Sequence, residues 1–201
     1  MDEIDAVIKV LNLKLRRINL SDDPPRIKLG DMGEALAKYG IKQCLFDRDF
    51  RVGQRGSRTF TLQRHYRAGE QGIGSIDDYL KFRVKWWKKY RCFVEVKNWT
   101  LMRNGIDDDI FESEILDRFR KNDRFGRRFW ALAITEVNVR YIEERCRRNN
   151  IRIIPIAEYL TDLQMEPMFL KPILEQFMEE FSQVIDDIVS GRLRRGNPWG
   201  R

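Results

Sequence analysis

Residues 92–97 read Cys-Phe-Val-Glu-Val-Lys, an apolar run that is interrupted by one carboxylate and one ammonium group. The aromatic and β-branched residues of this run favour a β-strand. Residues two positions apart in a strand point to the same face of the sheet. We therefore expect Glu95 and Lys97 to project together, while Val94 and Val96 pack on the opposite face. The alternative is an ordinary surface ion pair on a half-buried strand.

A second predicted strand, IDDYLKFRV at residues 76–84, brings two further acids. Alternation places Asp78 in an apolar stripe, and Asp77 in a stripe that also carries cationic residues. A buried carboxylate is costly unless it is paired or bound to a metal. A hairpin between the two strands can bring Asp78 beside Glu95 and Lys97, with Asp77 as the alternative acid. Two converging carboxylates would hold a hard divalent cation such as Mg²⁺ through oxygen ligands.

The order of elements around these strands predicts an α/β fold. Apolar spacings predict helices at 4–18, at about 31–39 (closed by Gly40), around 110–119, at 138–148 and at 174–188. Extended segments are predicted at about 43–52, 58–66, 76–86, 92–99, 129–134 and 151–156. This order indicates a mixed sheet, flanked by helices, that begins as an antiparallel meander and continues through helical crossovers.

A length of 201 residues fits one domain. Within it we expect an N-terminal helix and linker at 1–30, a core at 31–160, and a C-terminal helix with a basic tail at 161–201. Apolar residues from Leu174 to Ile188 recur at spacings of three and four, which is typical of a packed helix pair. This seam either covers the protein's own sheet or forms a homodimer contact.

The charge distribution favours a polyanionic partner. The net charge is +7, and the cations are separated from the acids along the chain. We expect contacts to a nucleic-acid backbone from the basic strands and the basic tail, namely from Arg51, Arg55, Arg58, Arg64, Arg67, Lys85, Lys88, Lys89, Arg194 and Arg195. Such contacts give salt-sensitive binding with little reading of base edges.

Other functional classes find no support in the sequence. No stretch approaches the twenty or so apolar residues that a membrane span needs, and the acidic N-terminus lacks an apolar signal region. Three widely separated cysteines and a single histidine do not provide the ligands of a structural zinc site. We therefore expect a protein without membrane contact in a reducing cytoplasm, or in the host cytoplasm if the protein is viral.

Together these motifs resemble the PD-(D/E)XK, or restriction-endonuclease-like, nuclease superfamily. Gly33-Glu34 lies in a predicted helix, an acid follows in a strand, and Glu95-Val96-Lys97 forms the E-x-K element after hydrophobic residues. The archaeal Holliday-junction resolvases, which are small, basic and often dimeric, are similar members. The match departs from the family pattern because no proline precedes the acid and a long connection separates Asp78 from Glu95.

The resemblance, which covers roughly residues 31–156, implies an αβββαβ core and metal-dependent hydrolysis of phosphodiester bonds, usually in DNA. It implies Mg²⁺ as cofactor, with Mn²⁺ as a substitute, held by Asp78 (or Asp77), Glu95 and Glu34, and Lys97 as the catalytic lysine. Glu34 has a simpler reading as a helix-surface residue. With no base-reading element in view, we expect structure-selective rather than sequence-specific cleavage. The expected substrate is DNA, with RNA as a less favoured option. The alternative is a non-catalytic nucleic-acid-binding protein that retains the fold.

Overall fold

The computed structural model describes residues 3–52, 58–66, 76–85, 87–97, 109, 111–122, 129–134, 139–155 and 167–193. Its helices are α1 (Glu3–Asn19), α2 (Pro25–Asp47), the π-helical turn η1 (Phe111–Leu116), α4 (Asp117–Asn122), α5 (Val139–Arg148) and α6 (Pro167–Ser190). Its strands are β1 (Arg51–Val52), β2 (Thr59–Tyr66), β3 (Ile76–Lys85), β4 (Lys88–Lys97), β5 (Phe129–Ile134) and β6 (Ile151–Pro155).

The described strands form one mixed sheet in sequence order, from β1 to β6. β2, β3 and β4 are antiparallel neighbours, and β5 and β6 continue the sheet parallel to β4. A parallel neighbour requires a crossover, and η1 with α4 and then α5 lie in these two connections. The predicted α/β class is therefore confirmed, with a meander from β2 to β4 that is followed by crossovers. The sheet does not begin as a meander, however, because the short strand β1 pairs in parallel with β2.

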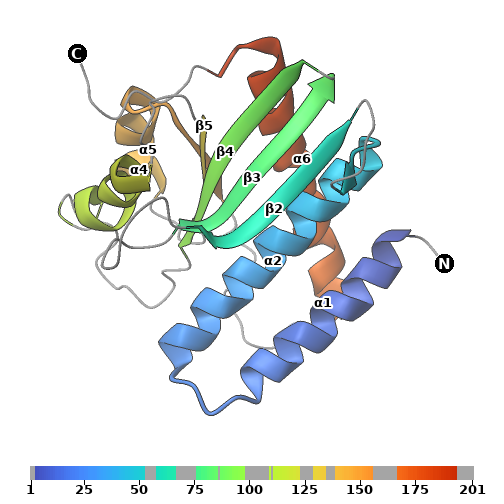
Figure 1. Cartoon of the computed structure of the whole chain (residues 1–201). Coiled ribbons are helices and arrows are strands. Elements are labelled where there is room, and N and C mark those ends of the chain that lie inside the picture. The colour runs from blue at the N-terminus through green and yellow to red at the C-terminus, as the bar shows by residue number, and fades with distance from the viewer. Residues whose placement is uncertain are drawn as a thin grey trace.

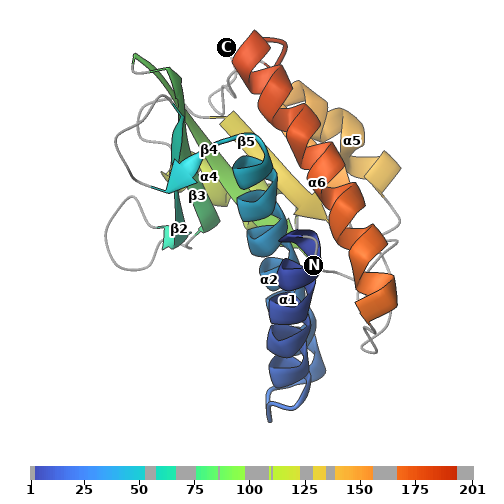
Figure 2. The same cartoon turned by 90° about the vertical axis from the view of Figure 1, so that its right-hand side faces the viewer.

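Helices cover the sheet on both faces. One apolar cluster joins α1, α2 and α6 to β2, β3 and β4, and a second cluster joins η1, α4 and α5 to the opposite face of β3 and β4. Figure 1 shows α4 and α5 beside the sheet, and Figure 2 shows α1, α2 and α6 together on one side of the meander. The strands at the centre therefore carry buried residues on both faces.

The apolar seam of α6 is buried inside the chain. Its members are at most 2% exposed and belong to the larger cluster: Leu174, Phe177, Phe181, Val184 and Ile188. The seam therefore packs against the protein's own sheet and helices. These five residues are not available for a homodimer contact.

Helix α2 is longer than the sequence suggested. It begins at Pro25, so the expected boundary at residues 30/31 falls inside it, and it continues through Gly40 to Asp47. The segment 43–52 was predicted as a strand, but only Arg51–Val52 is extended. The helix persists because Ile41, Cys44 and Leu45 bury one helical face against the core.

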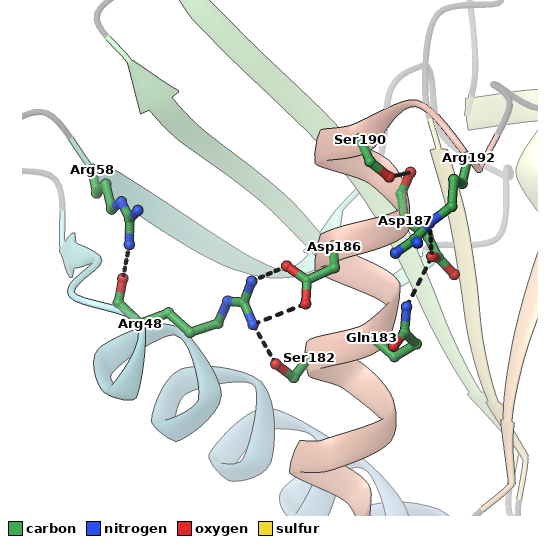
Figure 3. A network of polar contacts seen from close by, with 8 residues as sticks. All are labelled: Arg48, Arg58, Ser182, Gln183, Asp186, Asp187, Ser190 and Arg192. Atoms are coloured by element: carbon green, nitrogen blue, oxygen red, sulfur yellow. Dashed lines mark hydrogen bonds and ion pairs between the residues drawn. The ribbon is translucent and has the colours of Figure 1, made fainter.

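Polar contacts at the end of α2 hold it to α6 (Figure 3). The Arg48 guanidinium donates hydrogen bonds to the hydroxyl of Ser182 and to the carboxylate of Asp186, which it also pairs with electrostatically. Arg58, the residue before β2, donates a hydrogen bond of 2.8 Å to the Arg48 carbonyl oxygen. These contacts fix the point where the chain leaves α2 and enters the sheet.

Two further observations concern the described helices and the cysteines. None of these helices is long and apolar enough to cross a membrane. Cys44, Cys92 and Cys146 are buried and free of disulfides. Burial raises the pKa of the Cys44 and Cys146 thiols to about 12, so both stay protonated at neutral pH.

Gly40 tests the packing of α2 on α6. A Cβ atom at this position would overlap the Phe177 ring and lie 2.7 Å from its Cε1, whereas a Cβ at Gly30 of the same helix would meet nothing within 4 Å. We expect Gly40→Ala to lower the free energy of unfolding by about 1–3 kcal/mol through overpacking. Gly30→Ala should raise it by up to about 1 kcal/mol, because alanine favours a helix. Denaturant unfolding measures both, and a Gly40→Ala variant as stable as Gly30→Ala would contradict the packing.

Candidate active site

Strand register brings Asp77, and not Asp78, beside Glu95. β3 and β4 pair so that Asp78 lies opposite Val94, which sets Asp77 opposite Glu95. Opposed residues of an antiparallel pair share one face of the sheet. Asp78 is only 1% exposed and lies on the face of Val94, which packs under α1, α2 and α6. The preferred assignment of Asp78 to the site is therefore corrected in favour of the alternative, Asp77.

The backbone of each strand binds the acid of the other. The Val96 N–H donates a hydrogen bond of 2.7 Å to Asp77 Oδ2, and the Asp77 N–H donates one of 3.4 Å to Glu95 Oε2. These reciprocal contacts hold both carboxylates at the open end of the β3–β4 hairpin, where β3 begins and β4 ends.

Glu95 is completely buried and is neutralised by two cations. Its Oε1 atom lies 2.6 Å from Lys97 Nζ and 2.8 Å from Arg118 Nη1, so the predicted convergence of Glu95 and Lys97 is confirmed. A buried carboxylate needs such compensation, because removing its partners leaves an uncompensated charge. The remaining oxygen, Oε2, is directed to the backbone of Asp77.

Arg118 is a site residue that the sequence analysis missed. It comes from α4, and its guanidinium bridges Glu95 and Glu114. Glu114 also lies 3.9 Å from Lys97 Nζ. The only sequence signal is the spacing of Glu114 and Arg118, four positions apart in the helical segment that follows the E-x-K strand, and such i,i+4 pairs are common on helix surfaces.

The electrostatics of Asp77 mark the site. Burial, followed by the negative charge of Glu95, raises the pKa of the Asp77 carboxyl well above its ordinary range, and Glu34 raises it further. Lys97 and the Val96 N–H act in the opposite direction. Glu34, which α2 contributes, is thus within electrostatic reach of Asp77, as the predicted constellation requires. A strongly perturbed carboxyl beside a charge partner is typical of functional sites.

These acids fit a divalent cation held by few protein ligands. Among the described residues, no three histidine, cysteine, aspartate or glutamate side chains are grouped closely enough to hold a metal ion. Mg²⁺, however, commonly binds through one or two carboxylates and completes its shell with water and substrate phosphates. The repulsion between Asp77 and Glu95 is what such an ion relieves, so these two residues fit it as ligands.

The predicted nucleic-acid contacts divide into three groups. Arg55, Arg67, Arg194 and Arg195 lie outside the described residues, and of Arg64 only the backbone, in β2, is described. The described side chains that are exposed are those of Arg51, Arg58, Lys85, Lys88 and Lys89. Of these, Arg58 is already engaged with the Arg48 carbonyl oxygen.

A comparison of the chain with protein-family models, with curated proteins and with solved structures finds no match. The chemistry of the site therefore has to follow from its own geometry.

We expect the ionised Asp77 carboxylate to lower the free energy of unfolding at neutral pH. Its pKa is raised in the folded state above the value of about 3.9 in an unfolded chain. Stability that is present below pH 3.9 is thus lost as the pH rises toward the folded-state pKa. We expect Asp77→Asn to raise the melting temperature at pH 8 by a few degrees, since about 1 kcal/mol shifts it by 2–4 °C in a domain of this size. At pH 4 the gain should vanish.

The measurement compares variant and wild type at each pH, so that other titrating groups cancel. Asn keeps an acceptor for the Val96 N–H, and Asp117→Asn on α4 serves as the control for loss of one acid. A loss of stability that is equal at both pH values would mean that the charge of Asp77 is not unfavourable in the fold.

Proposed function

We propose that this chain is a metal-dependent nuclease of the PD-(D/E)XK class that hydrolyses phosphodiester bonds in DNA. One observation carries the proposal: Asp77, Glu95 and Lys97 converge on one face of two antiparallel strands, with Glu34 in electrostatic reach. The three-layer arrangement around a mixed sheet is compatible with a restriction-endonuclease-like core. With Asp77 as the first acid, the residue that stands where the motif has proline is Ile76.

The chemistry follows from the side chains at the site. Hydrolysis forms a bond from a water oxygen to phosphorus and breaks one phosphorus–oxygen ester bond, with a proton passing to the leaving oxygen. A magnesium ion bound by Asp77 and Glu95 would supply positive charge to the phosphoryl oxygens and a more acidic bound water. Lys97, held by Glu95, stabilises the negative charge that develops on the phosphoryl group or orients the attacking water.

Arg118 supports this arrangement as a positioning residue. It shares Glu95 Oε1 with Lys97, and Glu114 fixes its other end. Two cations on one oxygen hold the carboxylate in a single orientation, which leaves Oε2 directed toward Asp77. A nucleic acid as substrate is supported by the net charge of +7 and by the exposed cations of β3 and β4.

A specific observation also favours the second candidate, a nucleic-acid-binding protein that retains the fold without catalysis. Lys97 and Arg118 already neutralise Glu95, so the buried acid has a structural explanation that needs no metal. This alternative predicts binding to DNA without any requirement for a divalent cation.

Cleavage assays separate the two candidates. Wild-type protein, Asp77→Asn and Lys97→Ala are incubated with end-labelled single-stranded, duplex, flapped and four-way DNA, and with single-stranded RNA, in Mg²⁺, Mn²⁺ or EDTA. We expect cleavage that needs the metal and falls by at least about 10²-fold in both variants, because each removes charge from the reacting centre. The ranking of substrates identifies the preferred structure.

Lys121→Ala is the matched control, since it removes one cation from α4, where Lys121 is more than half exposed. It should cleave like wild type, and melting temperatures show that every variant is folded. Tight binding with no cleavage of any substrate in either metal would overturn the nuclease proposal and support the binding protein.

A further inference from the structure

The face of β3 and β4 that carries Asp77 and Glu95 continues into a set of four cations. Register places Lys81 opposite Arg91 and Arg83 opposite Lys89, and all four follow Asp77 or precede Glu95 by an even number of residues. They therefore lie on the same face of the sheet as the candidate active site. We call this set the cationic lane: Lys81, Arg83, Lys89 and Arg91.

The lane lies beyond the helices that cover this face. Tyr79 and Phe93 are buried under η1 and α4, and the Lys81 ammonium lies 4.9 Å from the centre of the Tyr79 ring, at the edge of that cover. From there the two strands run to the turn that joins them, which Figure 1 shows at the top right, away from α4. Lys81, Lys89 and Arg91 are exposed there, and Arg83 is half-buried.

The lane gathers four cations on one face of two neighbouring strands with no acid among them. In the part of the chain that the structure describes, none of its four members forms an ion pair with a carboxylate. Several cations elsewhere do have acidic partners: Arg48 with Asp186, Arg118 with Glu95, Arg120 with Glu112, Arg148 with Glu144, and Arg192 with Asp187. Four cations gathered without counter-charge repel one another, and an anionic ligand would remove that cost.

The surface at the lane is hollowed rather than flat. A shallow depression of about 300 Å³ is lined by the four cations together with Thr59, Phe60, Thr61, Phe82 and Tyr90. Thr61 and Thr59 lie opposite Lys81 and Arg83 in β2, so their hydroxyl groups belong to the same face. Hydroxyls beside cations are the side chains that commonly bind phosphate oxygens.

We propose that the cationic lane binds consecutive phosphates of one nucleic-acid strand, as a holding site separate from the candidate active site. The two cation pairs are about 7 Å apart along the strands and the two strands about 5 Å apart, which suits one backbone rather than both backbones of a duplex. The lane begins about 14 Å from Asp77 along β3. Binding here does not depend on the proposed nuclease activity, although a bound strand lies on the face that carries the acids.

Fluorescence anisotropy of a labelled single-stranded 20-nucleotide DNA, in EDTA and over a range of salt concentrations, tests the lane. Each lost phosphate contact lowers the slope of log affinity against log salt by about 0.7 for a single strand. We expect slopes reduced by about 1.4 in Arg83→Ala/Lys89→Ala and in Lys81→Ala/Arg91→Ala. Arg83→Lys/Lys89→Arg keeps both charges and should keep the slope.

The matched control is Arg147→Ala/Arg148→Ala on α5, which removes the same charge from side chains that are 78% and 71% exposed. Equal weakening in lane and control variants would overturn the proposal, because it would show an effect of net charge alone. The proposal would also be overturned if the wild-type protein bound phosphatidylserine vesicles but did not bind the oligonucleotide. Asp77→Asn should bind with the wild-type slope, so that loss of cleavage and loss of the lane remain distinguishable.

Discussion

The buried charge of Glu95 is the constraint around which this end of the structure is organised. A carboxylate without solvent contact is tolerated only when cations and hydrogen-bond donors surround it. Lys97 comes from the same strand, Arg118 from the helix that follows, and the Asp77 backbone from the neighbouring strand. One side chain thereby ties together the hairpin and the crossover helix, and the register of β3 and β4 has to keep Asp77 opposite it.

Asp77 adds an interaction that works against stability. Burial raises the pKa of its carboxyl, and the negative charges of Glu95 and Glu34 raise it further. Neighbouring carboxylates that raise the pKa of a buried acid are common at functional sites, and a bound cation would relieve their repulsion. This repulsion is the physical basis for reading the cluster as functional rather than as an internal salt bridge alone.

The same strands separate opposite charges along one face. Acids lie where β3 begins and β4 ends, and the four cations of the lane lie toward the turn that joins the two strands. Buried aromatic residues, Tyr79 and Phe93, stand between the two regions under η1 and α4. If the proposed nucleic-acid strand binds the lane, it runs from cations toward the acids, where a bound metal would offset their repulsion of a phosphate.

The sequence by itself determined the α/β class, the positions of β2 and β3, the second half of β4, and the pairing of Glu95 with Lys97, because strand alternation is a local property. It placed the start of β4 at Cys92, four residues after its actual start at Lys88. It failed where the outcome depends on distant packing. Gly40 looks like a helix end until Phe177 of α6 is placed against it. Asp78 looked like the site acid because one stripe of β3 is apolar, yet helices bury both faces, so apolar character could not identify the functional face. Only the register of two strands, and a helix that brings Arg118 to Glu95, decided which charges meet.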